Sequence, residues 1–346
     1  MLKKITILIL FSLLAGCSQS SNDSNANQPS GSAETAGSSS SGNIFAGENL
    51  NYIVTTNAGG GYDAYARLIG RYLVKKLGGD NVVINNIPGG GHIVGTNTLW
   101  KSKADGLTIG TVNAGLIYNQ LIGVKTLQFD ISKFSWIGKA AGEPRSLVIS
   151  EDCQVQSMEE LLASVEVIKL ASAGVGSASY LDTKLLAEAF DLNVDIIPGF
   201  EGNEGEMSMM RGEVCGQFGT TSSVQPFVDS GYGHFILTVG GEVEGVPNAM
   251  EFVSTDKARR IVSLIGALSE LGRVTAAPPG TDPEVMERLR EAYTATLNDP
   301  EFLAEAEKMK LPIDAASGDT VDQLVMAAMN QPQETIDIIA DSVRVE

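Results

Sequence analysis

Three consecutive glycines followed by an aspartate mark the stretch of this chain that is best suited to ligand binding. Residues 57–67 read Asn-Ala-Gly-Gly-Gly-Tyr-Asp-Ala-Tyr-Ala-Arg, which places Gly59, Gly60 and Asp63 between a predicted strand and a predicted helix. Backbone without Cβ atoms can approach a ligand closely, and the N–H groups at a helix start carry partial positive charge. The pattern favours anion binding, although a tight turn without any ligand has the same sequence signature.

A second junction, at 173–180, repeats this arrangement with hydroxyl groups. It reads Ala-Gly-Val-Gly-Ser-Ala-Ser-Tyr and leads from a predicted strand through Gly176, Ser177 and Ser179 into an amphipathic helix. Each serine can either cap the helix through its oxygen or donate a hydrogen bond to an anion. A further glycine-rich turn, at 88–92, opens another predicted helix.

The elements that must position these turns follow from hydrophobic periodicity. We expect strands at 50–55, 81–86 and 107–112, with helices at 64–77 and from 92 to about 102 between them. Such alternation gives a parallel sheet, and ligands then bind beyond the carboxyl ends of its strands. Glycine turns at neighbouring strand ends therefore indicate one shared site.

The sequence contains no recognisable catalytic or metal-binding set. His92 and His234 have neither metal-site nor triad spacing, and no serine lies in a Gly-x-Ser-x-Gly sequence. The glycine turns match neither the dinucleotide nor the phosphate-loop pattern. Arg67 and Arg145 are the only basic residues that we place near the site, and Arg67 can pair with Asp63 four positions earlier. We predict no enzyme activity, no cofactor and no metal.

Composition and charge limit the class of protein. The 346 residues allow two ordinary domains, and 43% of them are hydrophobic, which suffices for a packed core. With 24 basic and 42 acidic side chains the net charge is −18, which argues against binding to nucleic acid or to an anionic membrane surface. This general field repels an anionic ligand, so we expect local dipoles to bind it.

The N-terminus has the pattern of a lipoprotein signal. Two lysines precede the apolar run 5–14, which is too short to span a bilayer, and Leu-Ala-Gly-Cys ends at Cys17. The pattern predicts a signal segment 1–17 with lipidation of Cys17; an ordinary signal peptide with a chance cysteine is the alternative. Residues 18–47 are rich in Ser, Asn and Gly and predict a flexible tether.

Two cysteines remain after the predicted signal, Cys153 and Cys215. In an oxidising compartment an even remainder suggests one disulfide. Two buried free thiols are the alternative. The tether itself favours a receptor or an extracellular enzyme over a cytosolic catalyst.

Several motifs, in order along the chain, share their pattern with one family. They are 57–67, similar to Pro-Gly-Gly-x-x-Asp-x-x-Ala-Arg; 85–91, similar to Glu-Asn-Arg-Pro-Gly-Ala-Gly-Gly; 104–108, similar to Ala-Pro-Asp-Gly-Tyr-Thr; 174–181, similar to Gly-x-Gly-Ser-x-x-His-Leu; and 277–281, similar to Ala-Pro-x-Gly-Thr. In these motifs the chain resembles the substrate-binding receptors of tripartite tricarboxylate transporters, also called the Bug family. The resemblance covers the sequence from about Leu50 to its end.

The resemblance implies an α/β fold of the two-lobed periplasmic-binding-protein type (type II, Venus flytrap), whose lobes close on a small organic carboxylate. It divides the chain into a first lobe, 48–142 with 268–346, and a second lobe, 143–267. Both lobes would offer backbone N–H groups and hydroxyls to the ligand. The ligand-binding residues that it implies are Ala58, Gly59, Gly60 and Asp63 in the first lobe and Gly176, Ser177 and Ser179 in the second.

The implied function is that of an extracytoplasmic or periplasmic receptor, anchored in the membrane through Cys17, that passes a carboxylate to integral membrane transporter subunits. A lipid-anchored extracellular enzyme and a solute sensor are the alternatives. The sequence departs from the family pattern at Asn57, where proline is usual, and at Tyr180, where histidine is usual. At 198–202, Pro-Gly-Phe-Glu-Gly replaces Pro-Tyr-Lys-Gly, which removes a cation near the cleft and leaves the identity of the ligand open.

Overall fold

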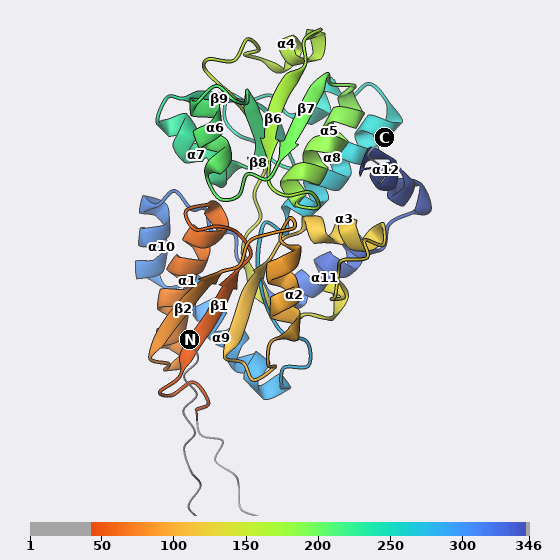
Figure 1. Cartoon of the computed structure of the whole chain (residues 1–346). Coiled ribbons are helices and arrows are strands. Elements are labelled where there is room, and N and C mark those ends of the chain that lie inside the picture. The colour runs from red at the N-terminus through yellow and green to blue at the C-terminus, as the bar shows by residue number, and fades with distance from the viewer. Residues whose placement is uncertain (1–42, 344–346) are drawn as a thin grey trace, which may run out of the picture. The chain divides into compact units, whose positions relative to one another are not determined.

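Two β-sheets with helices on their faces make up the part of the chain that the computed structural model describes, residues 43–343 (Figure 1). In chain order the elements are β1 (Asn49–Val54), α1 (Gly61–Leu77), β2 (Asn81–Asn86), α2 (Ile93–Lys101), β3 (Thr108–Val112), α3 (Gly115–Leu121), η1 (Ile131–Lys133), β4 (Ser135–Ala141), β5 (Arg145–Ser150), α4 (Met158–Ala163), β6 (Ile168–Ser172), α5 (Ala178–Phe190), β7 (Val194–Pro198), α6 (Glu204–Met210), β8 (Gly216–Thr220), α7 (Thr221–Asp229), β9 (Gly233–Val239), η2 (Ala249–Phe252), α8 (Asp256–Ser269), β10 (Arg273–Ala277), α9 (Pro283–Leu297), α10 (Pro300–Lys308), β11 (Ala316–Ser317), α11 (Gly318–Met329) and α12 (Gln333–Val343). None of the described helices combines the length and apolar composition needed to cross a bilayer.

The first sheet has the strand order β11-β4-β10-β3-β1-β2. β1 runs parallel to both β2 and β3, which is the arrangement that the strand–helix alternation predicted. Beyond β3 the sheet becomes antiparallel, because β10 pairs with β3 and β4, and β11 pairs with β4. The predicted parallel strands are therefore one side of a mixed sheet. Its strand β10 comes later in the sequence than all strands of the second sheet.

The second sheet has the strand order β7-β6-β8-β5-β9. β6 is parallel to β7 and β8, whereas β5 is antiparallel to β8 and β9. Helices α5 and α8 cover one face and α6 and α7 the other (Figure 1). A disulfide joins Cys153, just after β5, to Cys215, just before β8, with 5.2 Å between the Cα atoms. We call the first sheet with α1–α3 and α9–α11 the first lobe, and the second sheet with α4–α8 the second lobe.

The start and the end of the described chain differ from the expectations. The signal segment 1–17, with Cys17, lies outside the described residues, as does the predicted tether up to residue 42. Residues 43–47, however, belong to the folded body: Phe45 is 2% exposed in the core of the first lobe. The predicted end of the tether was therefore placed too far along the chain.

The C-terminus holds a helix that the sequence reading missed. The helix expected to be the last, from Thr320, is α11, and α12 follows it. The predicted division assigns this part of the chain to the first lobe, but α12 packs against α5 of the second lobe, and its Ile339 is fully buried. Pro332 followed by Gln-Glu-Thr was an available start signal for this helix.

Candidate functional site

A cavity lies between the two lobes, where strands of both sheets end. Its walls include residues just after β1, β3 and β7, the last residues of β6 and β8, and the first residues of β5 and β10. This is the edge at which strand–helix alternation places a ligand. The polar side chains that contribute most to its chemistry are His92, Asn113 and Arg273 from the first lobe and Arg145, Glu201 and Glu206 from the second.

Two of the seven residues predicted to bind the ligand, Gly60 and Ser179, line this cavity. The other five do not. Ala58 and Gly59 are exposed on the turn before α1. The remaining three are Asp63, Gly176 and Ser177, which support the two predicted turns.

Asp63 holds the first glycine turn in place. Its Oδ2 accepts hydrogen bonds from Gly59 N at 3.0 Å and from Arg67 Nε at 2.8 Å, and its Oδ1 accepts one from Asn86 Nδ2 at 3.0 Å. Burial alone would raise the pKa of Asp63, but these hydrogen bonds outweigh it and lower the pKa. Asp63 is therefore a charged anchor for the turn, and the predicted pair with Arg67 is present.

The two serines of the second turn have separate roles. Ser177 is fully buried, and its Oγ accepts a hydrogen bond from Tyr180 N at 3.2 Å, so it caps α5. Ser179 Oγ accepts one from Ala173 N at 3.0 Å and faces the cavity wall. Gly176, with φ of 99°, provides the left-handed backbone of this turn.

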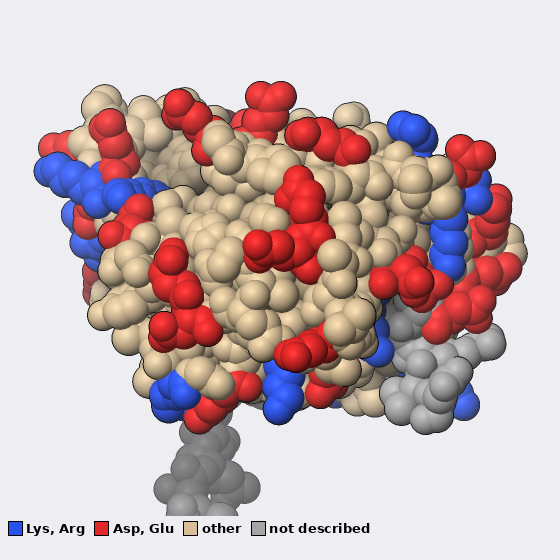
Figure 2. Space-filling view, turned by 90° about the horizontal axis from the view of Figure 1, so that it is seen from above, with Lys and Arg blue, Asp and Glu red and all other residues tan. Residues whose placement is uncertain are grey.

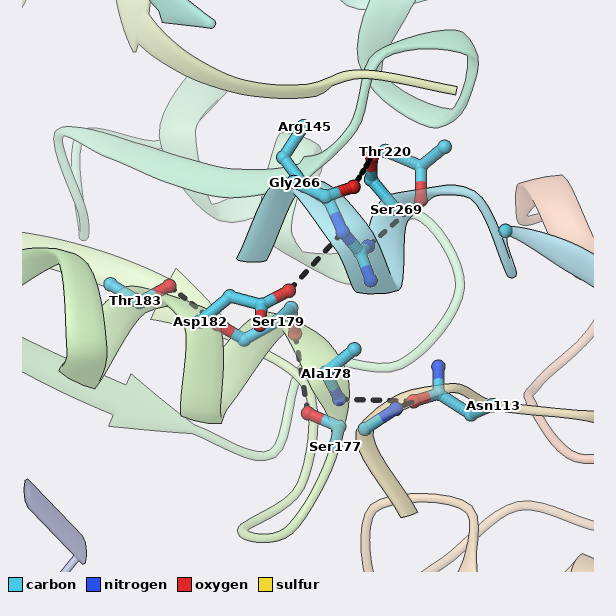
Figure 3. Close-up of polar contacts among 12 residues, drawn as sticks. Asn113, Arg145, Ser177, Ala178, Ser179, Asp182, Thr183, Thr220, Gly266 and Ser269 are labelled. Carbon is cyan, nitrogen blue, oxygen red and sulfur yellow. Dashed lines mark hydrogen bonds and ion pairs between the residues drawn. The ribbon is translucent and has the colours of Figure 1, made fainter. Parts of the chain in front are cut away.

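Asn113 joins the two lobes at the back of the second turn (Figure 3). Its Oδ1 accepts hydrogen bonds from Gly115 N of the first lobe at 2.9 Å and from Ala178 N of the second lobe at 3.1 Å. The backbone N–H at the start of α5 is thus already used by a side chain of the opposite lobe. The amide orientation of Asn113 follows from these contacts, because its oxygen is the only acceptor it has.

Arg145 and Asp182 form a buried ion pair beside the cavity, with 3.2 Å between Nε and Oδ2 (Figure 3). Arg145 Nη1 also donates to Thr220 Oγ1 at 3.0 Å. Asp182 Oδ1 accepts a hydrogen bond from Tyr118 of the first lobe at 2.8 Å, so the pair couples the lobes. Complete burial raises the pKa of Asp182, while Arg145 and Tyr118 act against that rise.

Arg273 is a second guanidinium group in the cavity wall, and the sequence reading missed it. Its Nη2 donates to Ser223 Oγ at 2.8 Å, and its central carbon lies 4.7 Å from the ring centre of Tyr62 and 5.1 Å from that of Tyr65. Glu143 compensates its charge, with Nε and Oε1 at 3.7 Å. An arginine opening the apolar strand Arg-Val-Thr-Ala-Ala was an available signal, since buried charges are rare without a partner or a role.

These guanidinium groups change the expected electrostatics. Figure 2 shows acidic side chains spread over the face seen from the α4 side, with most of the Lys and Arg near its edges. Inside, Arg145 and Arg273 line the cavity, each less than a tenth exposed. The cavity wall therefore contains guanidinium groups in addition to the helix-start dipoles that the sequence predicted.

His92 is a neutral wall residue and begins α2 with φ of 76°. Its Nε2 lies 3.1 Å from Asn113 Nδ2, which can only donate, so its Nδ1 carries the proton toward Thr55 Oγ1 at 2.8 Å. Burial, followed by the charges of Arg145 and Arg273, lowers the pKa of His92 to about 3. The other histidine, His234, lies on β9 and contacts Glu151 and Gln156, and it does not line the cavity.

We expect His92 to make the protein less stable in mild acid. Its pKa in the folded state is depressed from 6.5 to about 3, so below pH 6.5 the unfolded chain binds the proton and the folded chain does not. The free energy of unfolding should therefore fall by about 2 kcal/mol from this group between pH 7.5 and pH 5. Urea unfolding at both pH values measures it.

The control is His92→Asn, because asparagine tolerates the positive φ of this position. The variant should lose about that part of the pH dependence, whereas all other titrating groups stay in place. An equal drop in stability in both proteins would contradict the assignment of a neutral, buried His92.

Comparisons with known proteins extend over most of the chain. The family model described as "Tripartite tricarboxylate transporter family receptor" matches residues 65–340. Protein BugT of Bordetella pertussis is 23% identical over 314 residues, which are 85% of this chain and 86% of BugT.

Two solved structures share the fold. MatC from Rhodopseudomonas palustris with bound malate has a TM-score of 0.69 and 20% identity, and the match covers 84% of this chain and 98% of MatC. An R. palustris protein with adipate has a TM-score of 0.70 and 18% identity, covering 84% and 97%. The predicted two-lobed α/β fold is thereby confirmed.

Proposed function

Because this chain belongs to the tripartite tricarboxylate transporter family receptors, which are solute-binding proteins and not enzymes, we propose that it captures a small organic carboxylate between its lobes. It then delivers the ligand to integral membrane transporter subunits. The observation that carries the carboxylate assignment is the pair of buried guanidinium groups, Arg145 and Arg273, in the cavity of a protein with net charge −18. Guanidinium offers forked donors that match a carboxylate.

The proposed contacts combine both lobes. Gly60 presents backbone at the start of α1, Ser179 presents a hydroxyl, and the two arginines provide charge. Ala58, Gly59, Asp63, Gly176 and Ser177 shape the two turns in this proposal and do not touch the ligand directly. The dicarboxylates malate and adipate in the two similar structures support an anionic ligand of comparable size.

We also place this function outside the cytoplasm, in the periplasm, with a lipid anchor on Cys17. The disulfide between Cys153 and Cys215 supports an oxidising compartment. The proposal needs no cofactor and no metal, and the described residues include no cluster of three or more His, Cys, Asp or Glu side chains suited to a metal ion.

Thermal unfolding of the purified protein with a panel of mono-, di- and tricarboxylates tests the function. A ligand present at a hundred times its Kd should stabilise the folded state by about 2.7 kcal/mol and raise Tm by several degrees. Diamides of the same acids are the matched control, because they keep the shape but lose the charge. A protein that no carboxylate stabilises, or that converts the bound carboxylate in an NMR time course, would contradict the receptor assignment.

A further inference from the structure

Two carboxyl groups in the cavity wall have no cationic partner. Glu201, after β7, is 8% exposed; its Oε1 accepts a hydrogen bond from Gly174 N at 3.4 Å, and its Oε2 is buried without a hydrogen-bond partner among the described residues. Glu206, on α6, accepts one from Gln217 Nε2 at 3.0 Å, and its Oε2 is likewise buried and unpartnered. Both residues line the cavity.

In contrast to the two glutamates, each arginine of the cavity lies beside a group of opposite charge. Arg145 pairs with Asp182, and Arg273 with Glu143. His92 is neutral, because burial and the two arginines lower its pKa to about 3. None of the ion pairs within residues 43–343 includes either of the two glutamates. Glu201 and Glu206 therefore have no counter-charge among the described residues. Burying a carboxylate without one is costly.

The wall holds the two acids where they are. The Gln217 amide lies against α6, since a Cβ on Gly205 would be 2.0 Å from Gln217 Oε1. That amide donates to Glu206 Oε1, and Glu206 Oε2 remains buried without a hydrogen-bond partner in the described part of the chain. On the other side, Gly174 holds one oxygen of Glu201. Each glutamate is therefore held through one oxygen, and its second oxygen is buried without a hydrogen-bond partner among the described residues.

The positive and negative groups of the cavity are held by different residues of one strand. Arg145 bonds to Thr220 and Glu206 bonds to Gln217, and these two residues of β8 are three positions apart. All four charged residues line the same cavity, so one ligand can meet both guanidinium and carboxyl groups.

We propose that the ligand supplies the missing cation: it is a carboxylate that also carries a protonated amino group. This inference rests on the proposed function, and it assigns the carboxylate to Arg145 and Arg273 and the ammonium to Glu201 and Glu206. An ammonium offers three donors, enough for both free carboxyl oxygens. Burial raises the pKa of both glutamates, because it disfavours their charged form.

Calorimetry at pH 7.5 with matched pairs of ligands tests this assignment. The pairs are aspartate with succinate, glutamate with glutarate, and γ-aminobutyrate with butyrate. In at least one pair the amino compound should bind tenfold or more tightly than its partner. If every amino compound binds no better than its partner while carboxylates do bind, this inference is overturned and the receptor function stands; if nothing binds, the receptor function itself fails.

Substitution of the acids gives a second readout. Glu206→Gln and Glu201→Gln keep the shape and one acceptor oxygen, so each should weaken the amino ligand at least tenfold and leave its des-amino partner unchanged or tighter. Glu159→Gln on α4 removes the same charge from the exposed surface of the second lobe and should change neither affinity. Unchanged binding of the amino ligand in both cavity variants overturns the proposal. A dicarboxylate whose affinity rises as pH falls, and whose affinity no longer depends on pH in Glu206→Gln, also overturns the proposal. In that case a protonated Glu206 donates a hydrogen bond to a second carboxylate of the ligand.

Discussion

Gly115→Ala should weaken ligand binding by about ten- to a hundredfold while leaving the free protein folded. A Cβ at this position would lie 2.2 Å from Ala178 N and 2.4 Å from Ala178 Cα, which belong to the opposite lobe. The lobes could then close only by separating locally, and such overpacking costs about 1–3 kcal/mol. Alanine favours the helix that starts here, so the first lobe itself should lose no stability. Isothermal titration calorimetry with the ligand found in the carboxylate panel measures the change.

Gly70→Ala is the matched control for this prediction. Its Cβ would lie 2.8 Å from Val82 Cγ2, a contact between α1 and β2 inside the first lobe. We expect the control to lower Tm but to keep the affinity, the reverse of Gly115→Ala. Two other glycines of the first lobe, Gly60 and Gly91, also approach backbone of the second lobe, at Gly202 and Ser177. Unchanged affinity in Gly115→Ala would show that the ligand does not require this close approach of the lobes.

Arg145→Met should lower the free energy of unfolding at neutral pH by about 3–5 kcal/mol, the usual cost of leaving a buried charge without its partner. Asp182 would remain fully buried with only the Tyr118 hydroxyl to stabilise its charge. Its pKa in the folded state, already raised, would rise further above the unfolded value of about 3.9. The folded variant would then hold a proton that the unfolded chain has lost, so its stability should fall as pH rises from 5 to 8.

The double variant Arg145→Met with Asp182→Leu separates charge from packing. Replacing both members of a buried pair by apolar residues is often neutral, so the double variant should recover most of the lost stability. It should also lose the added pH dependence, because the orphaned carboxyl group is gone. Urea unfolding of the four proteins between pH 5 and pH 8 completes the cycle. A double variant as unstable as Arg145→Met alone would show that arginine packing, and not the ion pair, supports this region.

The local elements of the fold could be predicted from the sequence, because each depends on residues close together in the chain. Strands β1 to β3 begin and end within one residue of the expected positions, and the glycine turns do open α1, α2 and α5. The burial of Phe45 and the packing of α12 on α5 were missed, since both depend on contacts with distant elements; the start of α12 itself had a local signal at Pro332. The mixed character of the first sheet has the same cause: β10 joins it from far along the chain.

The candidate site was harder to predict, for a related reason. Gly60 and Ser179, which line the cavity, could be predicted because glycine and serine at a helix start have a recognisable local pattern. Arg273 and Glu206 lie in no such turn: Arg273 begins an apolar strand, where its charge was the available signal, and Glu206 lies in a Met-rich helix. Only the pairing of strands brings them into one cavity with Arg145, so the strand order decides which charged residues line its wall.

The three passages of the chain between the lobes restrict how the molecule can open. Residues 141–145 and 269–273 both connect the lobes and lie side by side, since Glu143 N donates to Ser269 O at 3.2 Å. The third passage leads from α11 to α12, which is seated on α5. Two adjacent connecting segments allow the lobes both to bend apart and to twist relative to each other, whereas a third, separate connection resists the twist. The lobes should therefore separate mainly by rotation about a single axis, with little twist.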